Sequence, residues 1–237
     1  MCTVLLRLEP GGPWPILLGA VRDEFVERAW DPPARHWPAG WSHLVGGRDQ
    51  VAGGTWLAVD PRAPAVAALL NAGRRDDDGA GPRPTRGTLA LRILAAEGLP
   101  ADLARYDRFH LLRVTLDVSE LWSWDGDDLH HQVLPPGDHI IVNAGLDTHT
   151  DPLVPHFAPL LAATPSDPAA WTHLLAGDGL APDDDRALLV QREVEGRLYG
   201  STSASLVALS PTAARYEFTA TPARPSWYEV APGGAPT

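Results

Sequence analysis

Two apolar runs near the start of the chain are separated by a short turn. Residues 3–8 and 16–21 are rich in aliphatic side chains, and a Gly-Gly-Pro segment at 11–13 lies between them. This pattern predicts a β-hairpin over residues 1–24.

The rest of the chain alternates between blocks that are typical of strands and of helices. Further strands are predicted at 53–59, 65–70, 109–118, 120–124, 129–134, 140–142, 187–195, 197–209 and 214–220. Helices are predicted at 24–30, 87–97 and 100–106, and in two pieces over 153–175 that Thr164-Pro165 separates. Strands followed by helices and then more strands are typical of an α+β fold with antiparallel sheets.

The length of 237 residues and the apolar fraction of 44% suit one large domain with a sizeable core. We expect this domain to span residues 1–230, followed by a flexible Pro- and Gly-rich tail at 231–237. Residues 72–86 are predicted to form a polar loop, in which Thr85 can cap the next helix. No apolar stretch approaches the roughly 20 residues that span a bilayer.

Charge and composition exclude several classes of function. The formal charge of -11 and the pI near 5.1 argue against binding to the phosphate backbone of nucleic acid. All 19 basic residues are arginines, which excludes Schiff-base and P-loop chemistry because both use lysine. The absence of lysine, with 24 prolines and 22 glycines, suggests GC-rich coding in a bacterium. The chain does not begin with a signal-peptide pattern, so we expect a cytoplasmic protein.

Polar clusters away from the N-terminus lack the spacing of metal or cofactor sites. His130 and His131 are adjacent, so in a strand their rings point to opposite faces. The aspartate runs at 76–78 and 183–185 do not match an EF-hand loop. Asp147 and His149 fall on one face of an extended segment, as a proton-transfer pair or as part of a polar loop. We therefore expect neither a metal nor a cofactor.

The only cysteine, Cys2, has a position with unusual chemistry. Because the predicted turn is centred near Gly12, antiparallel partners have numbers that sum to about 24, and Cys2 is expected to face Arg22 beside Asp23. Removal of Met1 would give Cys2 a free α-amine with a reference pKa of roughly 7.7–8.0, next to a thiol of roughly 8.5. One residue would then carry both a nucleophile and a base.

Attack on an acyl carbon also needs hydrogen-bond donors for the developing oxyanion. Asn71 and Asn143, the only two asparagines, each end an apolar strand and are the candidates. Simpler roles are open for all of these residues. A lone Cys is often a small buried hydrophobe, Arg22 and Asp23 can form a surface ion pair, and Asn is common in turns.

Several short blocks of the sequence point to a known family. Val21-Arg22-Asp23-Glu24-Phe25 is one, and the block AGGTWL at 52–57 is the most specific. The others are at 1–3, 47–49, 70–71, 85–87, 134–137, 143–148 and 199–201. In order and spacing these blocks resemble the NRDE family, also called the transport and Golgi organisation protein 2 family. The resemblance covers roughly residues 1–209.

That family is similar to the N-terminal-nucleophile (Ntn) hydrolases of the cysteine branch, which includes penicillin V acylase and bile salt hydrolase. The resemblance implies an α+β fold with four layers, αββα, made of antiparallel sheets and helices. It implies Cys2 as the nucleophile, Asp23 as the carboxylate that orients its amine, and Arg22 near the thiolate. Asn143 and Asn71 match positions that supply oxyanion donors.

The sequence departs from the family pattern at three places. Val21 stands where the NRDE tetrad begins with Asn, and Thr202 stands where the family has an Arg. His149-Thr150-Asp151 replaces a Trp-Pro-Lys block. These departures indicate either a different substrate or a lost activity with a retained pocket.

We interpret the chain as an N-terminal cysteine hydrolase or acyltransferase that acts on a small-molecule amide, ester or thioester through a Cys2 acyl-enzyme. The alternative is a non-catalytic haem- or lipid-handling trafficking protein of the same family, and a third reading is an interaction module with a decayed active site. Five of the nine tryptophans lie between Trp14 and Trp56, where they line an acyl pocket or belong to the core. The sequence leaves open the acyl group, the acceptor and any homo-oligomeric state.

Overall fold

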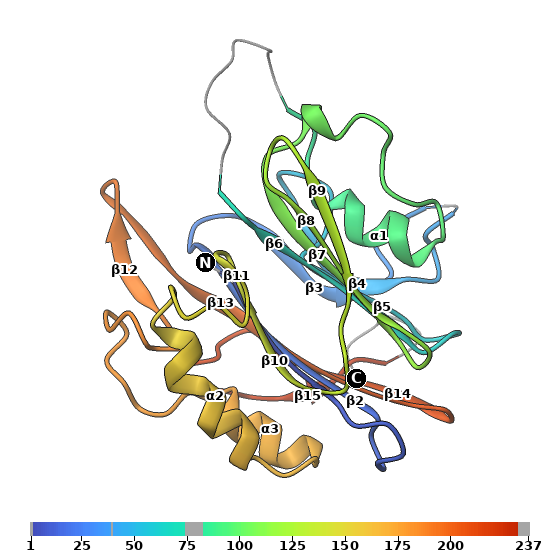
Figure 1. The fold of residues 1–237 in the computed structure, drawn as a ribbon. Helices are drawn as coiled ribbons and strands as arrows, with labels where there is room; N and C mark the ends of the chain where they lie inside the picture. Colours follow the sequence, from blue (N-terminus) through green and yellow to red (C-terminus); the bar gives the residue numbers. More distant parts are fainter. Residues whose placement is uncertain (1, 39, 74–82, 232–237) are drawn as a thin grey trace. The chain divides into compact units, whose positions relative to one another are not determined.

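The chain forms two compact units, each built around one antiparallel sheet (Figure 1). The structure, a computed structural model, describes residues 2–38, 40–73 and 83–231. The first unit contains residues 2–28 and 136–231, and the second contains the described part of 29–135. Most of the predicted loop at 72–86 and the predicted tail after residue 231 lie outside the described residues. The single domain over residues 1–230 stays a prediction.

In the described part of the first unit, the sheet has eight strands with the N-terminal hairpin near its centre. The order is β11, β10, β1, β2, β13, β14 and β15, and β12 pairs with β13 beside this path. The strands are β1 (Cys2–Leu8), β2 (Ile16–Phe25), β10 (Gly137–Val142), β11 (Gly145–Leu146), β12 (Gln191–Val194), β13 (Arg197–Ser210), β14 (Ala213–Thr219) and β15 (Tyr228–Glu229). Because β2 is hydrogen-bonded to β1 on one side and to β13 on the other, its residues are positioned by both neighbours.

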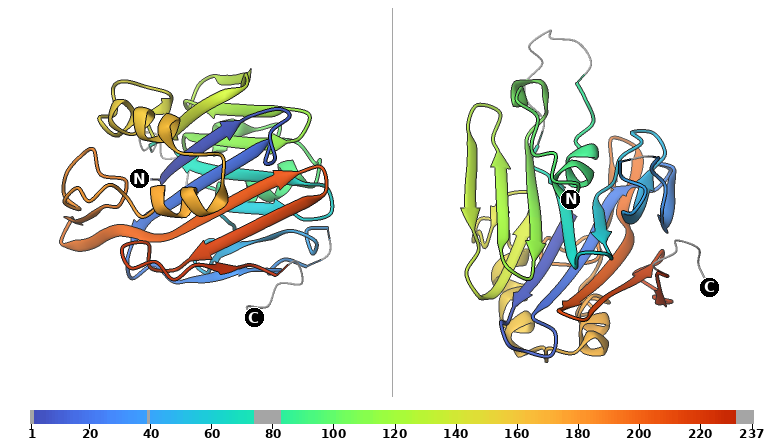
Figure 2. Two further views of the ribbon diagram at one scale, coloured as in Figure 1. Left: turned by 90° about the horizontal axis from the view of Figure 1, so that it is seen from below. Right: turned by 90° about the vertical axis from the view of Figure 1, so that its right-hand side faces the viewer.

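Helices α2 (Leu153–Ala163) and α3 (Pro168–Leu174) pack against this sheet (Figure 2). Phe157 and Trp171 from these helices are fully buried in one cluster with Leu5 of β1. Full burial of a large apolar side chain contributes about 1.5–3 kcal/mol. The cluster therefore stabilises the hairpin strands from which the N-terminal site is built.

The sheet of the second unit has seven strands, whose order follows the sequence within the described residues. They are β3 (Trp30–Ala34), β4 (Val45–Asp49), β5 (Leu57–Asp60), β6 (Ala65–Asn71), β7 (Phe109–Thr115), β8 (Ser119–Trp124) and β9 (Leu129–Val133). Helix α1 (Thr88–Leu94) packs on this sheet through Leu89 and Ile93, which share a buried cluster with Phe109.

The predicted fold class, α+β with antiparallel sheets, is confirmed by these pairings. The predicted register of the N-terminal hairpin is also confirmed, because Cys2 pairs with Arg22 and Leu8 with Ile16. The two predicted helical pieces over 153–175 are present as α2 and α3, and Pro165 lies between them.

The predicted helix at 24–30 is wrong, because strand β2 continues to Phe25. Glu24 and Phe25 pair with Gly200 and Tyr199 of β13, so the sheet uses their backbone groups. The partners in this pairing are more than 170 residues apart in the sequence. A local pattern does not reveal such a contact.

Strand β3 was not predicted, since it contains Pro32 and Pro33. It lies at the edge of its sheet, where a proline removes no necessary hydrogen bond. The predicted helix at 100–106 is only a 3-10 turn at Leu103–Arg105. The predicted helix at 87–97 is the shorter α1, because Ala96 beyond it has a positive φ of 58°.

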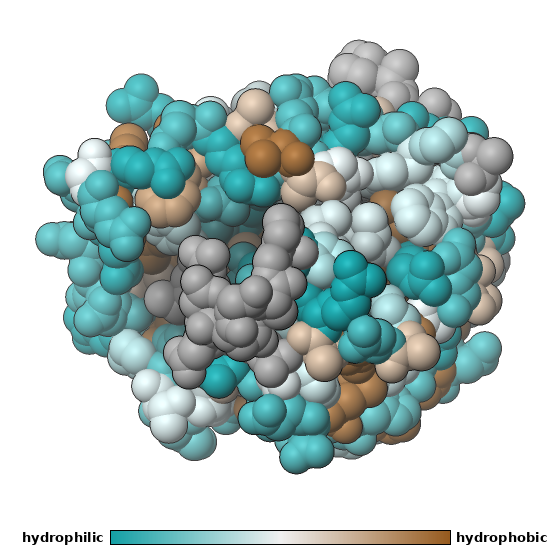
Figure 3. Space-filling model, turned by 90° about the horizontal axis from the view of Figure 1, so that it is seen from above, coloured by the Kyte–Doolittle hydropathy of each residue, from teal (hydrophilic) through white to brown (hydrophobic). Residues whose placement is uncertain are grey.

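Within the described residues, no helix is both long and apolar enough to cross a membrane. The face shown in Figure 3 is largely hydrophilic, with small and separate apolar patches. Exposed large hydrophobic side chains such as Val51 and Val133 are single features of the kind that most protein surfaces carry.

Arg7 of β1 connects the sheet to the end of α2. Its Nε and Nη2 bond the two carboxylate oxygens of Asp138 at 2.6 and 2.9 Å, and its Nη atoms bond the backbone oxygens of Leu161 and Thr164. Arg7→Met is expected to lower the free energy of unfolding by about 2–4 kcal/mol, because these acceptors lose a charged donor. Urea unfolding measures the change. Arg186→Met, at an exposed arginine, should stay within about 0.5 kcal/mol, and an equally small effect of Arg7→Met would contradict the prediction.

Candidate active site

Cys2 is the first residue of β1 and is half-buried. It pairs with Arg22 of β2 on one side, and Asn143 follows directly after β10 on the other side. The backbone N–H of Cys2 donates a hydrogen bond to Oδ1 of Asn143 at 2.8 Å. The Sγ atom lies 3.9 Å from the backbone oxygen of Asp23. The order of the strands thus brings Arg22, Asp23 and Asn143 together around Cys2.

Asp23 is a buried carboxyl group, with 6% of the residue exposed. Its Oδ1 accepts a hydrogen bond from Oγ of Ser201 at 2.6 Å, and its backbone oxygen accepts one from the hydroxyl of Tyr199 at 2.9 Å. Burial raises the pKa of Asp23 to about 7, against the opposing effects of the Ser201 hydrogen bond and of the charges on Arg192 and Arg22. The carboxyl group therefore changes its charge near neutral pH.

The thiol of Cys2 is shifted in the same direction. Burial raises its pKa, and the nearby Asp23 carboxylate adds to the shift while Arg22 opposes it. At neutral pH the thiol holds its proton. A nucleophilic Cys2 consequently needs a base that removes this proton during the attack.

Arg22 is buried and is hydrogen-bonded to Thr202, which stands where the family pattern has an arginine. Its Nη1 donates to Oγ1 of Thr202 at 2.9 Å, and the same Oγ1 donates to the backbone oxygen of Arg22 at 3.2 Å. The register between β2 and β13 shifts between Ser201 and Ser203, so Thr202 is a β-bulge. Thr202 thus supplies hydrogen bonds where the family pattern has a second cation.

Ser201 connects Asp23 to the segment before β12. Its backbone N–H donates to the backbone oxygen of Val190 at 2.9 Å, and its Oγ accepts from the N–H of Val190, also at 2.9 Å. A Cβ at Gly200 would lie 2.8 Å from the oxygen of Val190, so glycine is needed for this close approach.

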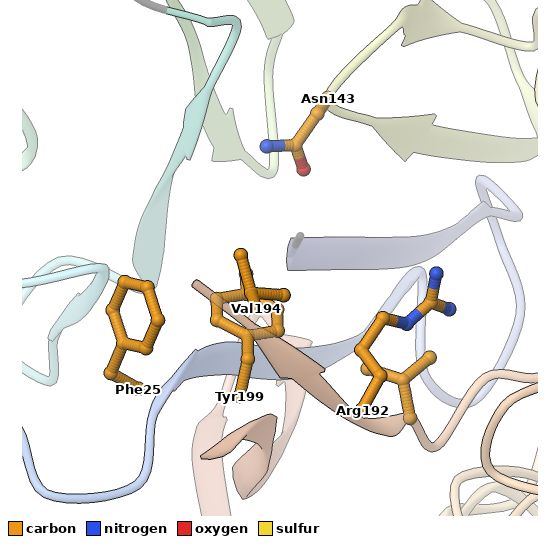
Figure 4. A pocket seen from close by; sticks show the side chains of 6 residues that line it. Phe25, Asn143, Arg192, Val194 and Tyr199 are labelled. Atoms are coloured by element: carbon orange, nitrogen blue, oxygen red, sulfur yellow. The ribbon is translucent and has the colours of Figure 1, made fainter. Parts of the chain in front are cut away.

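A cavity of about 310 Å³ lies beside these residues (Figure 4). Its lining residues are Phe25, Asn143, Val190, Arg192, Val194 and Tyr199. The rings of Phe25 and Tyr199 meet edge to face with centroids 5.4 Å apart. Because Asn143 both lines the cavity and binds the backbone of Cys2, the cavity is part of the same site.

Of the two roles that the sequence leaves open for the tryptophans near the N-terminus, pocket lining or core, the structure shows packing for those of the second unit. Among the described residues, the aromatic walls of this cavity are Phe25 and Tyr199. Trp37 instead belongs to a buried cluster of the second unit with the half-buried Trp41, and Trp30 packs edge to face on Trp56. The tryptophans named here are packing residues of the second unit.

Asn71 is the last residue of β6 in the second unit, where it pairs with Phe109 of β7 and is exposed. Its role as an oxyanion donor stays a prediction. Asp147 binds His139 rather than His149: its Oδ2 lies 2.9 Å from Nδ1 of His139, and its Oδ1 accepts from the N–H of Ile140. Asp147 is therefore held by β10, which agrees with the second role that the sequence leaves open for it, part of a polar loop.

The adjacent histidines of β9 bind different carboxylates. His130 lies 3.4 Å from Asp125, and His131 lies 3.1 Å from Glu120. Within the described residues, no group of three or more His, Cys, Asp or Glu side chains is arranged to hold a metal ion.

Three residues of the site were not predicted from the sequence, namely Tyr199, Ser201 and Arg192. A signal existed for the first two, since the block at 199–201 resembles a family block. Arg192 had no such signal. It reaches the site because β12 pairs with β13, which sets Arg192 opposite Tyr199.

A solved structure shares this fold. The Caenorhabditis elegans ortholog of N-acylethanolamine-hydrolyzing acid amidase matches with a TM-score of 0.50 and 9% sequence identity, over 87% of this chain and 92% of that chain. The chain thus shares the α+β fold of that amidase. The family model for Transport and Golgi organisation 2 matches residues 1–163, and the chain belongs to this family. No curated protein sequence matches the chain.

The buried Asp23 carboxyl predicts how stability changes with pH. Its pKa is about 7 in the folded chain and about 3.9 in an unfolded one, so between these values the folded state binds more protons. Stability is therefore expected to fall as pH rises through this window, and Asp23→Asn should reduce the fall. Melting temperatures at pH 5 and pH 8 test this. Asp184→Asn is the control, because the pKa of Asp184 is lowered to about 2 by Arg186, outside the window. Equal pH dependence in wild type and Asp23→Asn would contradict the prediction.

Proposed function

We propose that the protein is an N-terminal cysteine hydrolase or acyltransferase that acts on an amide, ester or thioester through a Cys2 acyl-enzyme. The observation that carries the proposal is the surroundings of Cys2. Its backbone nitrogen is bound by Asn143, and its thiol lies 3.9 Å from the backbone oxygen of Asp23, whose buried carboxyl acts electrostatically on the thiol. A mainly apolar cavity adjoins it. Family membership and the Ntn-hydrolase-like fold support the same chemistry.

In the proposed reaction, removal of Met1 first converts the Cys2 nitrogen into a free α-amine. Oδ1 of Asn143 accepts a hydrogen bond from this nitrogen, which leaves the amine oriented at the start of β1. The α-amine takes the thiol proton while Sγ attacks the acyl carbon and forms a C–S bond. The bond to the leaving nitrogen, oxygen or sulfur breaks, and the leaving group takes the proton from the ammonium. Water or an amine then attacks the thioester and restores the thiol.

Three side chains would stabilise the charges that form in this reaction. The ionised Asp23 carboxylate favours the ammonium form of the amine, and its pKa near 7 allows that ionisation close to neutral pH. The Asn143 amide carries its Nδ2 donor next to the oxygen that binds the Cys2 nitrogen, and we assign this donor to the oxyanion. Arg22, held by Thr202, favours the thiolate through its charge.

The first test is an intact mass spectrum of the protein after exposure to 4-nitrophenyl esters. The rate of turnover is measured from the release of 4-nitrophenol. We expect a chain without Met1 that carries one acyl group and turns over. Cys2→Ala should keep the fold, checked by circular dichroism, and lose the adduct and the turnover. Full turnover by Cys2→Ala would overturn the proposal. So would a chain that keeps Met1 and stays unlabelled, which would favour the non-catalytic, ligand-handling alternative.

Asp23→Asn is expected to lower the acylation rate by at least about tenfold, because the amine loses its carboxylate. In the wild type the rate should rise with pH as two groups lose protons, Asp23 with a midpoint near 7 and the α-amine with a reference pKa of roughly 7.7–8.0. The lower midpoint should be absent from the variant. Single-turnover acylation between pH 5 and pH 9 measures both effects. Glu24→Gln changes the neighbouring carboxylate, which binds the N–H of Phe25, and should leave the profile unchanged. An unchanged rate in Asp23→Asn would remove Asp23 from the mechanism.

A further inference from the structure

The cavity beside Cys2 combines a small volume with one charged side chain. At about 310 Å³ it is at the low end of ligand pockets and has room for roughly ten water-sized groups. Phe25, Val190, Val194 and Tyr199 make its walls mainly apolar. Arg192 is the charged residue among those that line it, as Figure 4 shows. Such a cavity suits a compact apolar group with one anionic end.

The backbone of Arg192 is fixed by strand pairing, while its guanidinium forms only a weak ion pair. The residue pairs with Tyr199 across the β12–β13 hairpin, which fixes where its side chain begins. Its Nη1 lies 3.2 Å from Oδ1 of Asp185, whose side chain is 75% exposed. An ion pair with so exposed a carboxylate is worth about 0–1 kcal/mol, because water screens it. A carboxylate brought in by a ligand can therefore replace Asp185.

The charge of Arg192 also acts within the site rather than only at the surface. It is one of the two arginines whose charge opposes the rise in the pKa of Asp23. The other, Arg22, is buried against Thr202. An anion bound to Arg192 would thus lie within electrostatic reach of the groups around Cys2, as the end of an acyl chain attached to Sγ would.

Building on the proposed function, we propose that the substrate's acyl group is compact and apolar and ends in a carboxylate, and that Arg192 selects it. The guanidinium presents several N–H donors in a planar fork that matches both oxygens of a carboxylate. The apolar walls beside the guanidinium suit the rest of such an acyl group. Arg192 is therefore a specificity-determining residue for an anionic acyl group.

The test compares two 4-nitrophenyl esters, one of glutaric acid with a free carboxylate and one of pentanoic acid without it. Wild type is expected to prefer the glutaryl ester in kcat/KM. Arg192→Gln should lower the ratio of kcat/KM for the glutaryl ester to kcat/KM for the pentanoyl ester about tenfold to hundredfold, because a change in the charge of Asp23 affects both esters alike. Asp185→Asn should lower the KM for the glutaryl ester, because a competing carboxylate is gone. Arg186→Gln, at an exposed arginine paired with Asp184, should change neither ester.

The outcomes separate this inference from the proposed function. If Arg192→Gln slows both esters equally, Arg192 acts through the charge on Asp23 and the inference is overturned. If wild type is acylated by neither ester, the proposed function fails on its own account. In that case, calorimetric binding of monomethyl glutarate and methyl pentanoate to Cys2→Ala decides the cavity's preference. Tighter binding of the anion that is lost in Arg192→Gln supports the anion site, and equal binding of the two esters overturns it.

Discussion

The antiparallel pairing of β1 with β2 sets Cys2 opposite Arg22, and the other groups of the site are arranged around that pair. β10 adds Asn143 from one side, and β13 adds Ser201 and Tyr199 from the other. Because a slip of one residue would turn every side chain of β1 to the opposite face, the register also decides whether the apolar cluster with α2 and α3 can form. Packing of the core and placement of the thiol therefore depend on the same hydrogen bonds.

The carboxyl of Asp23 is buried at a cost to stability. A group whose pKa is raised to about 7 by burial is held in an environment that disfavours its charged form. Ser201 offsets part of this cost with a short hydrogen bond, and Tyr199 holds the backbone oxygen of the same residue. Destabilised ionisable groups of this kind are common where a protein needs a proton to move near neutral pH. At the surface the effect is the opposite: Asp184 pairs with Arg186, and its pKa is lowered.

Local sequence patterns were enough to predict which residues lie next to Cys2. The sum of residue numbers across a tight turn was enough to pair Cys2 with Arg22, and the end of an apolar run was enough to single out Asn143. Ser201 was out of reach, because its contact with Asp23 depends on how β13 pairs with β2 around the bulge at Thr202. The same long-range pairing explains why the segment from Glu24 is a strand and not a helix. The contact of Asp147 with His139 was also out of reach, because the fold of β10 and β11 brings the two together.

Strand β12 differs from the strands that hold Cys2 in its position in the sheet. Within the described residues it pairs with β13 and lies off the main path of the sheet, whereas β1, β2 and β10 are joined in series. Changes in β12 therefore leave the ladder around the thiol intact, while they alter the wall that Arg192 and Val194 contribute to the cavity. Substitutions in this hairpin can therefore change the shape and charge of the cavity wall while the backbone pairing that positions Cys2 stays the same.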